Sequence, residues 1–219
     1  MTVHGTSGAD SLKKRLVEGL AAKLDGKDYI YTPQWEQFRK LTPGGFQSLI
    51  LSVSEYPDAS LFELHLGIRL DAVENMAYPF TNGLMGFQAN SLTLVTPLAK
   101  LHGHSFQRFE LAPGEEVGRP LDEIAGQLAH GGFSFLEKYN RLEEMEQLFN
   151  RHPHHPLPLV HNQINRCLRG LVLARLTDRT DFERLATLYR DRLRALRAPD
   201  ATLHKYDRLR SYLRSYAPN

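Results

Sequence analysis

The stretch that most constrains the fold of this chain runs from Gly44 to Leu70. Apolar and polar residues alternate strictly in its second half, from Phe62 to Leu70, and alternate less strictly in its first half. Strict alternation is typical of a strand with one buried and one exposed face. Between the halves stands Tyr56-Pro57-Asp58-Ala59, in which proline presets φ and aspartate can bond back to the backbone. The stretch therefore predicts a β-hairpin.

The patterns around the hairpin predict an α+β fold. Leucines at every fourth position from Leu12 to Leu24 predict an amphipathic helix before the sheet. Shorter strand candidates lie at 29–31, 34–41, 91–95 and 105–111. From Pro120 onward the apolar residues recur with the period of helices. We expect an N-terminal helix, a mostly antiparallel sheet of about five strands, and then a C-terminal bundle of several helices.

The clearest break in the chain is His152–Pro158, with the sequence HPHHPLP. It predicts an α+β sheet domain over residues 1–150 and a helical extension over residues 151–219 that packs on it. Two helix starts in this half have the sequence of a capping box. The pairs are Ser134 with Glu137 and Thr180 with Glu183.

Composition predicts a soluble globular protein, because 42% of the residues are hydrophobic and 24% are charged. The single cysteine, Cys167, excludes an intramolecular disulfide and suits a reducing compartment. The N-terminal residues lack the apolar core of a signal peptide, and no apolar run is long enough to cross a membrane. We therefore expect a cytoplasmic protein that does not bind membranes.

The charge of the chain is unevenly distributed, although the net charge is only +2. Residues 156–219 carry 12 arginines and one lysine against six acids, whereas acids outnumber bases in residues 1–155. A basic tail of this kind indicates a nucleic-acid or acidic protein partner. The alternative is that the two halves attract each other and that the arginines lie on solvated helix faces.

No pattern in the sequence indicates catalysis. His152, His154, His155 and His161 lie close together, but their spacing fits no structural zinc site, and the sequence alone does not decide whether they bind a metal. Cys167 lies beside an apolar helical stripe, where a buried, unreactive thiol is expected. The chain has neither a nucleophile elbow nor a phosphate-binding loop. We therefore expect a protein that is not an enzyme and that holds neither a cofactor nor a metal.

Two surfaces are candidates for binding a partner. One is the polar face of the predicted hairpin, with Glu63, His65 and Arg69. Whether helices cover this face or leave it open is not determined by the sequence. The other surface is formed by the C-terminal arginines, whose guanidinium groups suit contact with carboxylate or phosphate. Its candidate residues are Arg166, Arg169, Arg184 and Arg190.

Residues 9–150 resemble the DUF4304 type of bacterial domain. The resemblance begins with the leading amphipathic helix and a strand that ends near Phe38-Arg39. It continues through Phe46-Gln47-Ser48, the strand Phe62–Arg69, and the later stretches Gly132–Leu136 and Tyr139–Leu142. Some domains of this type lie beside polymorphic toxins and look like immunity proteins. The resemblance implies no catalytic residues.

These observations together predict a protein-binding module. The resemblance implies, more specifically, an immunity protein that neutralises a cognate toxin by covering it, with charge complementarity setting the rate and the specificity. The alternative is a nucleic-acid-binding module that uses the arginine-rich C-terminal helices. The identity of the partner and the oligomeric state do not follow from the sequence.

Overall fold

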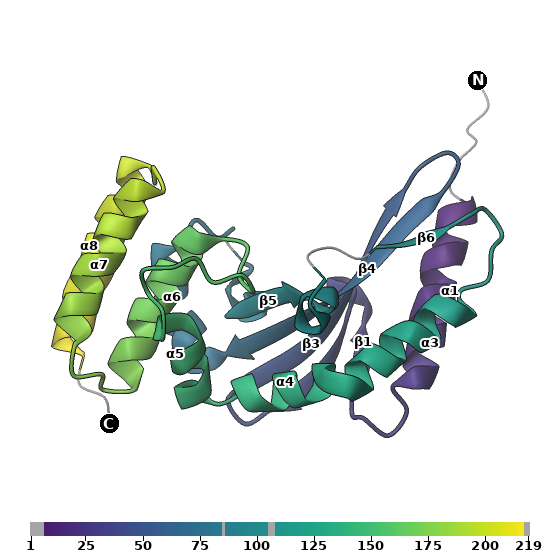
Figure 1. Ribbon diagram of the computed structural model, residues 1–219, viewed down its shortest axis with the longest axis horizontal. Helices are drawn as coiled ribbons and strands as arrows, with labels where there is room; N and C mark the ends of the chain where they lie inside the picture. Colours follow the sequence, from purple (N-terminus) through teal and green to yellow (C-terminus); the bar gives the residue numbers. More distant parts are fainter. Residues whose placement is uncertain (1–6, 85, 105–107, 217–219) are drawn as a thin grey trace. The chain divides into compact units, whose positions relative to one another are not determined.

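The computed structural model describes residues 7–84, 86–104 and 108–216, and it confirms the predicted α+β class (Figure 1). The chain forms two compact units that are interleaved along the sequence. We call them the sheet unit (Met1–Leu41, Gln47–Gly67 and Thr96–Phe135) and the helical unit (Thr42–Phe46, Ile68–Val95 and Leu136–Asn219). The predicted domain boundary near residue 150 stays a prediction.

The strands form one mostly antiparallel sheet with the order β1-β2-β3-β4-β5, and β6 pairs with β4. In β1 and β2, Tyr31 pairs with Phe38, and Phe62 of β4 pairs with Phe109 of β6. The strand bounds are β1 Ile30–Thr32, β2 Gln37–Thr42, β3 Gly45–Glu55, β4 Ser60–Leu70, β5 Leu94–Pro97 and β6 Phe109–Leu111. Of the predicted strand at 105–111, residues 105–107 lie outside the described residues.

The predicted hairpin is confirmed as β3 and β4, joined by a turn in which the Tyr56 amide donates to the Ala59 carbonyl. Buried and half-buried residues alternate on β4 from Phe62 to Leu66, as expected. From Gly67 to Leu70 every residue is buried, so the exposed face ends there. The hairpin begins at Gly45, whose φ is 148°. A Cβ at Gly45 would lie 2.1 Å from the carbonyl oxygen of Arg69.

The helices of the sheet unit pack through their leucines. Helix α1 (Ser7–Lys23) contacts α3 (Gly118–Gln127), and the two lie side by side in Figure 1. The predicted apolar stripe of α1 is confirmed, because Leu16 and Leu20 are fully buried. The chain kinks after α3 at Gly131, whose backbone is non-helical with φ 179° and ψ −26°. A π-helical turn (Leu128–Gly132) carries the chain into α4 (Phe133–Tyr139).

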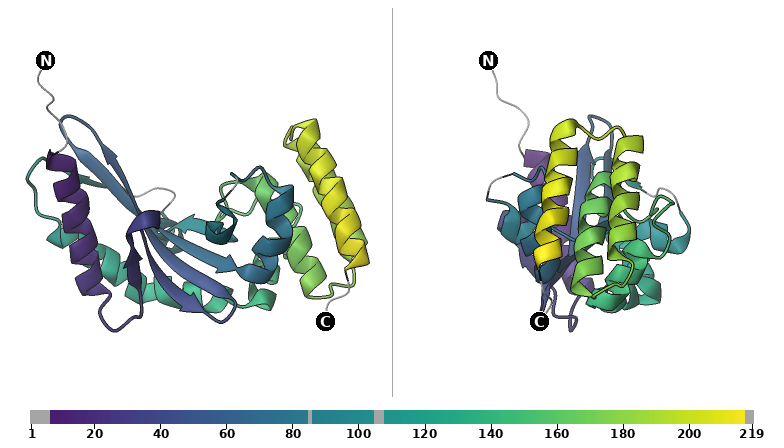
Figure 2. Two further views of the ribbon diagram at one scale, coloured as in Figure 1. Left: turned by 180° about the vertical axis from the view of Figure 1, so that it is seen from behind. Right: turned by 90° about the vertical axis from the view of Figure 1, so that its left-hand side faces the viewer.

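The helical unit is built on α6, which contacts α2, α5, α7 and α8. Helices α6, α7 and α8 are seen beside one another in the right-hand view of Figure 2. The loop over HPHHPLP separates α5 from α6, as predicted. The helix bounds are α2 Asp71–Ala77, α5 Leu142–Asn150, α6 Gln163–Leu176, α7 Phe182–Ala195 and α8 Asp200–Ser215.

Neither predicted capping box forms. Ser134 lies within α4, and its hydroxyl donates to the carbonyl of Gly131. Helix α7 begins after Asp181 without a side-chain cap, and Glu183 instead accepts from Arg210 and Arg214 of α8. The Thr180–Glu183 box does not form because arginines of another helix bind the Glu183 carboxylate.

Helices α5, α6 and α7 meet at a buried polar cluster. The side-chain amide of Asn150 donates to the Gly170 carbonyl at 2.8 Å and to Glu146 at 3.0 Å. The Tyr189 hydroxyl donates to Asn150 Oδ1. A Cβ at Gly170 would lie 2.7 Å from Asn150 Oδ1 and 2.9 Å from the Tyr189 hydroxyl, so the glycine is what lets the helices approach. Burial raises the pKa of the Tyr189 hydroxyl.

Candidate functional site: a groove along α7

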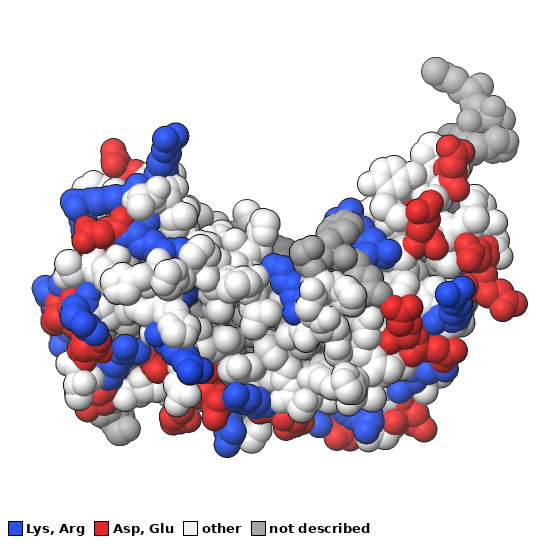
Figure 3. Space-filling model, viewed as in Figure 1, with Lys and Arg blue, Asp and Glu red and all other residues white. Residues whose placement is uncertain are grey.

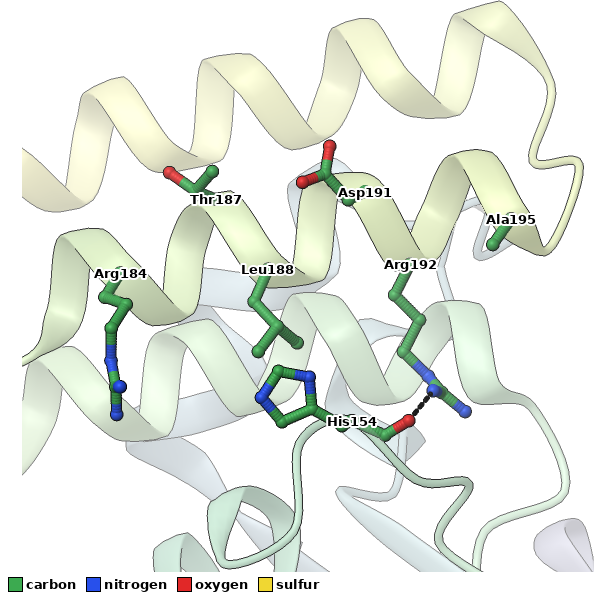
Figure 4. Close-up of a pocket in the computed structure, with 7 residues that line it drawn as sticks. All are labelled: His154, Arg184, Thr187, Leu188, Asp191, Arg192 and Ala195. Atoms are coloured by element: carbon green, nitrogen blue, oxygen red, sulfur yellow. Dashed lines mark hydrogen bonds between the residues drawn. The ribbon is translucent and has the colours of Figure 1, made fainter.

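An open groove of about 680 Å³ runs along the face of α7 that points away from its buried stripe. Buried residues of α7 include Leu185 and Tyr189, whereas the groove residues on the helix recur at three- and four-residue intervals on another side. The loop between α5 and α6 contributes His154. The lining consists of His154, Arg184, Thr187, Leu188, Asp191, Arg192 and Ala195 (Figure 4).

The middle of the groove is apolar and its ends are cationic. Leu188 points toward the ring of His154, with Arg184 on one side and Arg192 on the other (Figure 4). Arg192 Nη1 donates to the His154 carbonyl oxygen at 2.8 Å. This cation therefore also fixes the α5–α6 loop, which forms the wall of the groove opposite α7. The side chain of Arg184 is 83% exposed and contacts Asp181 at 3.0 Å.

The wall formed by the loop is held by α6 as well as by α7. The Arg166 guanidinium of α6 donates to the backbone carbonyl oxygens of Phe149, His152 and His155. The side chain of Gln163 accepts from the Leu157 amide at 3.1 Å and donates back to the Leu157 carbonyl at 3.0 Å. The loop is therefore fixed by backbone contacts although it lacks regular structure.

Ion pairs between α7 and α8 neutralise much of the charge beside the groove. Asp207 accepts from Arg190 at 2.7 and 2.8 Å, which lowers the pKa of that carboxyl group. The hydrogen bond from Arg214, together with that from Arg210, lowers the pKa of Glu183 to about 2. Basic and acidic side chains accordingly alternate over this surface in Figure 3.

The residues predicted to bind a partner are spread over different places. Arg184 lines the groove, and Arg190 is half-buried in its ion pair with Asp207. Glu63 and His65 are half-buried on β4, where Glu63 contacts His65 at 3.4 Å and Arg108 at 3.3 Å. Their role in binding stays a prediction.

Arg69, Arg166 and Arg169 are buried. For Arg166 and Arg169 of α6 the expected exposed surface was wrong, and for Arg69 burial answers a question that the sequence left open. Arg69 is 4% exposed because the segment around Gln88 and Ser91 covers it and accepts hydrogen bonds from its guanidinium. Arg166 is 1% exposed, beneath the loop that it holds. Arg169 is 9% exposed and makes a two-point contact with Glu74 of α2 at 2.7 and 2.9 Å.

Of the seven groove residues, the sequence predicted a binding role for Arg184 alone, and it singled out His154 as one of the clustered histidines and not as part of a binding surface. Leu188 was hidden because it lies outside the buried stripe of α7. The available signal was the second set of positions with helical spacing, from Arg184 to Ala195. The position of His154 beside this set depends on a contact across 38 residues, which no local pattern indicates.

Metal and thiol chemistry find no support in the geometry. Among the described residues, no group of three or more histidine, cysteine, aspartate or glutamate side chains is placed to hold a metal ion. Cys167 is fully buried, and burial raises the pKa of its thiol to about 12, which keeps it protonated and unreactive at neutral pH.

Comparison with protein families, curated proteins and solved structures gave no match to this chain. The resemblance to the DUF4304 type therefore stays a prediction from sequence. In the part of the chain that the structure describes, no helix combines the length and the apolar character needed to cross a membrane.

Proposed function

We propose that this chain is a protein-binding module and that the groove along α7 receives an acidic segment of another protein. The observation that carries the proposal is the apolar centre at Leu188 between the cations Arg184 and Arg192. A leucine or similar side chain of a partner would cover Leu188, and carboxylates on either side would meet the two guanidinium groups. Arginine pairs well with carboxylates in this way.

Protein binding is favoured over nucleic-acid binding by the ion pairs of the same unit. A surface that binds a phosphate backbone neutralises several phosphates with its lysines and arginines. Here Arg190, Arg210 and Arg214 each contact a carboxylate of α7 or α8. The neutralisation of a toxin by covering it, which the sequence resemblance implies, is one specific form of the binding proposed.

The test uses the full chain and three short fluorescent probes. The first is a peptide with a leucine between glutamates, the second a peptide with a leucine between lysines, and the third a single-stranded oligonucleotide. Fluorescence anisotropy at low and high salt measures each affinity. We expect the acidic peptide to bind most tightly and to weaken in high salt, because salt screens exposed charges.

A charge reversal in the groove separates specific from general attraction. Arg184→Glu should weaken the acidic peptide by about tenfold, which corresponds to about 1.4 kcal/mol. The matched control is Arg208→Glu, which places the same change at an exposed position of α8 outside the groove. Thermal melts check that both variants fold.

Two results would overturn the proposal. One is equal loss of peptide affinity in Arg184→Glu and Arg208→Glu, since the groove would then have no special role. The other is binding of the oligonucleotide as tight as that of the acidic peptide, which would favour the nucleic-acid alternative. The immunity role has its own test: coexpression with the product of a neighbouring toxin gene should relieve the toxicity of that product.

A further inference from the structure

A second, smaller cavity of about 300 Å³ lies in the helical unit, at the beginning of α6. Its walls come from residues 90–95, from Phe149 of α5, from the end of the α5–α6 loop at residues 160–162, and from the N-terminal half of α6. The polar side chains around it include Asn90, Thr93, His161, Asn165, Arg166 and Arg169. None of these residues lines the groove along α7.

The charge of Arg166 is not compensated by an acid. Its guanidinium donates to the Phe149, His152 and His155 carbonyls and to the side-chain oxygen of Gln163, all of which are neutral. No carboxylate within the described residues forms an ion pair with it. Burial lowers the pKa of this guanidinium, yet arginine stays charged in proteins. A buried charge without a counter-charge is unfavourable.

The other buried arginines of the described residues do have acidic partners. Arg169 pairs with Glu74, and Arg69 pairs with Asp71. Arg166 therefore leaves a net positive charge beside the cavity. Helix α6 begins at the same place, where the side chain of Asn162 caps it by accepting from the backbone amide of Asn165 at 2.9 Å. The positive end of the helix dipole therefore adds to the charge of Arg166.

Two hydrogen-bond donors remain available at the cavity wall. Arg169 uses Nε and Nη2 for Glu74, and no described residue accepts from its Nη1. The side-chain amide of Asn165 likewise has no partner among the described residues, and it is half-buried on the cavity wall. These two donors and the positive charge of Arg166 therefore lie around a cavity that is large enough for a small molecule.

We propose that this cavity binds a small oxyanion, either a carboxylate or a phosphate. Arg169 Nη1 and the Asn165 amide would donate to its oxygens, and the neighbouring Arg166 charge would be compensated. A volume of about 300 Å³ is at the lower end of ligand sites, which suits a small molecule and not a macromolecule. The inference is independent of the groove along α7 and of its proposed partner.

The experiment titrates the full chain with sodium phosphate, sodium acetate or sodium chloride at matched ionic strength. The readouts are the midpoint of thermal unfolding and the NMR shift of the Asn165 side-chain amide. We expect phosphate, acetate or both to raise the midpoint and move this signal in a saturable way that chloride does not reproduce. The two oxyanion arms distinguish the two classes of ligand.

The variant Asn165→Leu removes one donor and leaves the Arg169–Glu74 pair in place. It should weaken oxyanion binding by at least about fivefold, since a neutral-to-charged hydrogen bond is lost. The matched control is Ser211→Leu at an exposed position of α8, and in both variants the NMR signal of Arg169 Nε also reports binding. Effects no greater than those of chloride, or unchanged binding in Asn165→Leu, would overturn the proposal.

Discussion

The two units of this protein stabilise their interiors with different chemistry. Among the described residues, every buried charged side chain belongs to the helical unit: Arg69, Glu74, Glu146, Arg166 and Arg169. The buried polar residues of the sheet unit are neutral: Gln37, Gln47, Ser48 and Thr96. The other buried side chains in the described part of this unit are apolar, as at Leu16 and Phe62.

This difference changes what a substitution does in each unit. In an apolar interior the cost of a truncation follows the volume removed. In an interior with charges, the larger cost arises when one partner is removed and the other stays buried without it. A buried charge that lacks a partner also indicates where a ligand would bind, because it attracts an oppositely charged group.

The largest effect should come from breaking the buried ion pair of the helical unit. Glu74 is fully buried, so Glu74→Ala leaves the Arg169 guanidinium without its counter-charge. We expect a loss of about 3–5 kcal/mol in the free energy of unfolding, measured in urea. The control Lys13→Ala breaks the exposed pair with Glu36 and should cost less than about 1 kcal/mol. A similar cost for both variants would remove the distinction between the units.

In the sheet unit a comparable loss should require a cavity. Leu16 is fully buried in α1, and Leu16→Ala should cost about 2–5 kcal/mol. The control is Leu41→Ala, because Leu41 is 82% exposed and its truncation should change stability by less than about 0.5 kcal/mol. Urea denaturation of both variants measures the difference, and an equal response would contradict the burial described for α1.

A smaller effect is expected from one hydroxyl of the helical unit. Tyr189→Phe keeps the ring but removes the donor to Asn150 Oδ1 and to the Phe149 carbonyl. Because buried acceptors lose their partner, we expect a loss of about 1–3 kcal/mol. Tyr212→Phe is the control, since Tyr212 is 44% exposed. If Tyr189→Phe and the parent chain had the same free energy of unfolding, this cluster would contribute to stability through packing alone.

The smallest effect concerns pH and the exposed pairs of α7 and α8. Hydrogen bonds from Arg214 and Arg210 lower the pKa of Glu183 from 4.5 to about 2. A lowered carboxyl pKa contributes stability above the unfolded value, and this contribution is lost as pH falls from about 4.5 toward 2. Glu183 is 51% exposed, so the contribution should stay below about 1 kcal/mol. Urea unfolding of Glu183→Gln should therefore show a weaker fall in stability over this pH range than the parent chain.

The sequence predicted the elements that depend on local periodicity and turn residues. The leucine stripe of α1, the β3–β4 hairpin and its turn, and the helical periodicity after Pro120 were all expected from spacing alone. These predictions succeeded because a period of two or of 3.6 residues fixes which side chains share a face. The two capping boxes show the limit, since neither forms although both sequence motifs are present.

The candidate sites depended on long-range contacts and were predicted only in part. Arg184 was expected at a binding surface and lies in the groove. The burial of Arg169 follows from Glu74, which lies 95 residues earlier in the chain. The burial of Arg166 follows from contacts with backbone carbonyl groups that include those of Phe149 and His152. Every residue type has such a carbonyl, so the sequence gives no sign of these contacts. Residue type therefore identified cations, and only the fold determined which of them are exposed.

Gly170 has a consequence for how sequences related to this one can vary. Its missing Cβ is the space that Asn150 and the Tyr189 hydroxyl occupy. A larger residue at position 170 therefore requires smaller or differently shaped residues at positions 150 and 189. In an alignment of homologues these three positions should change together, and their covariation would report the contact among α5, α6 and α7 without any structure.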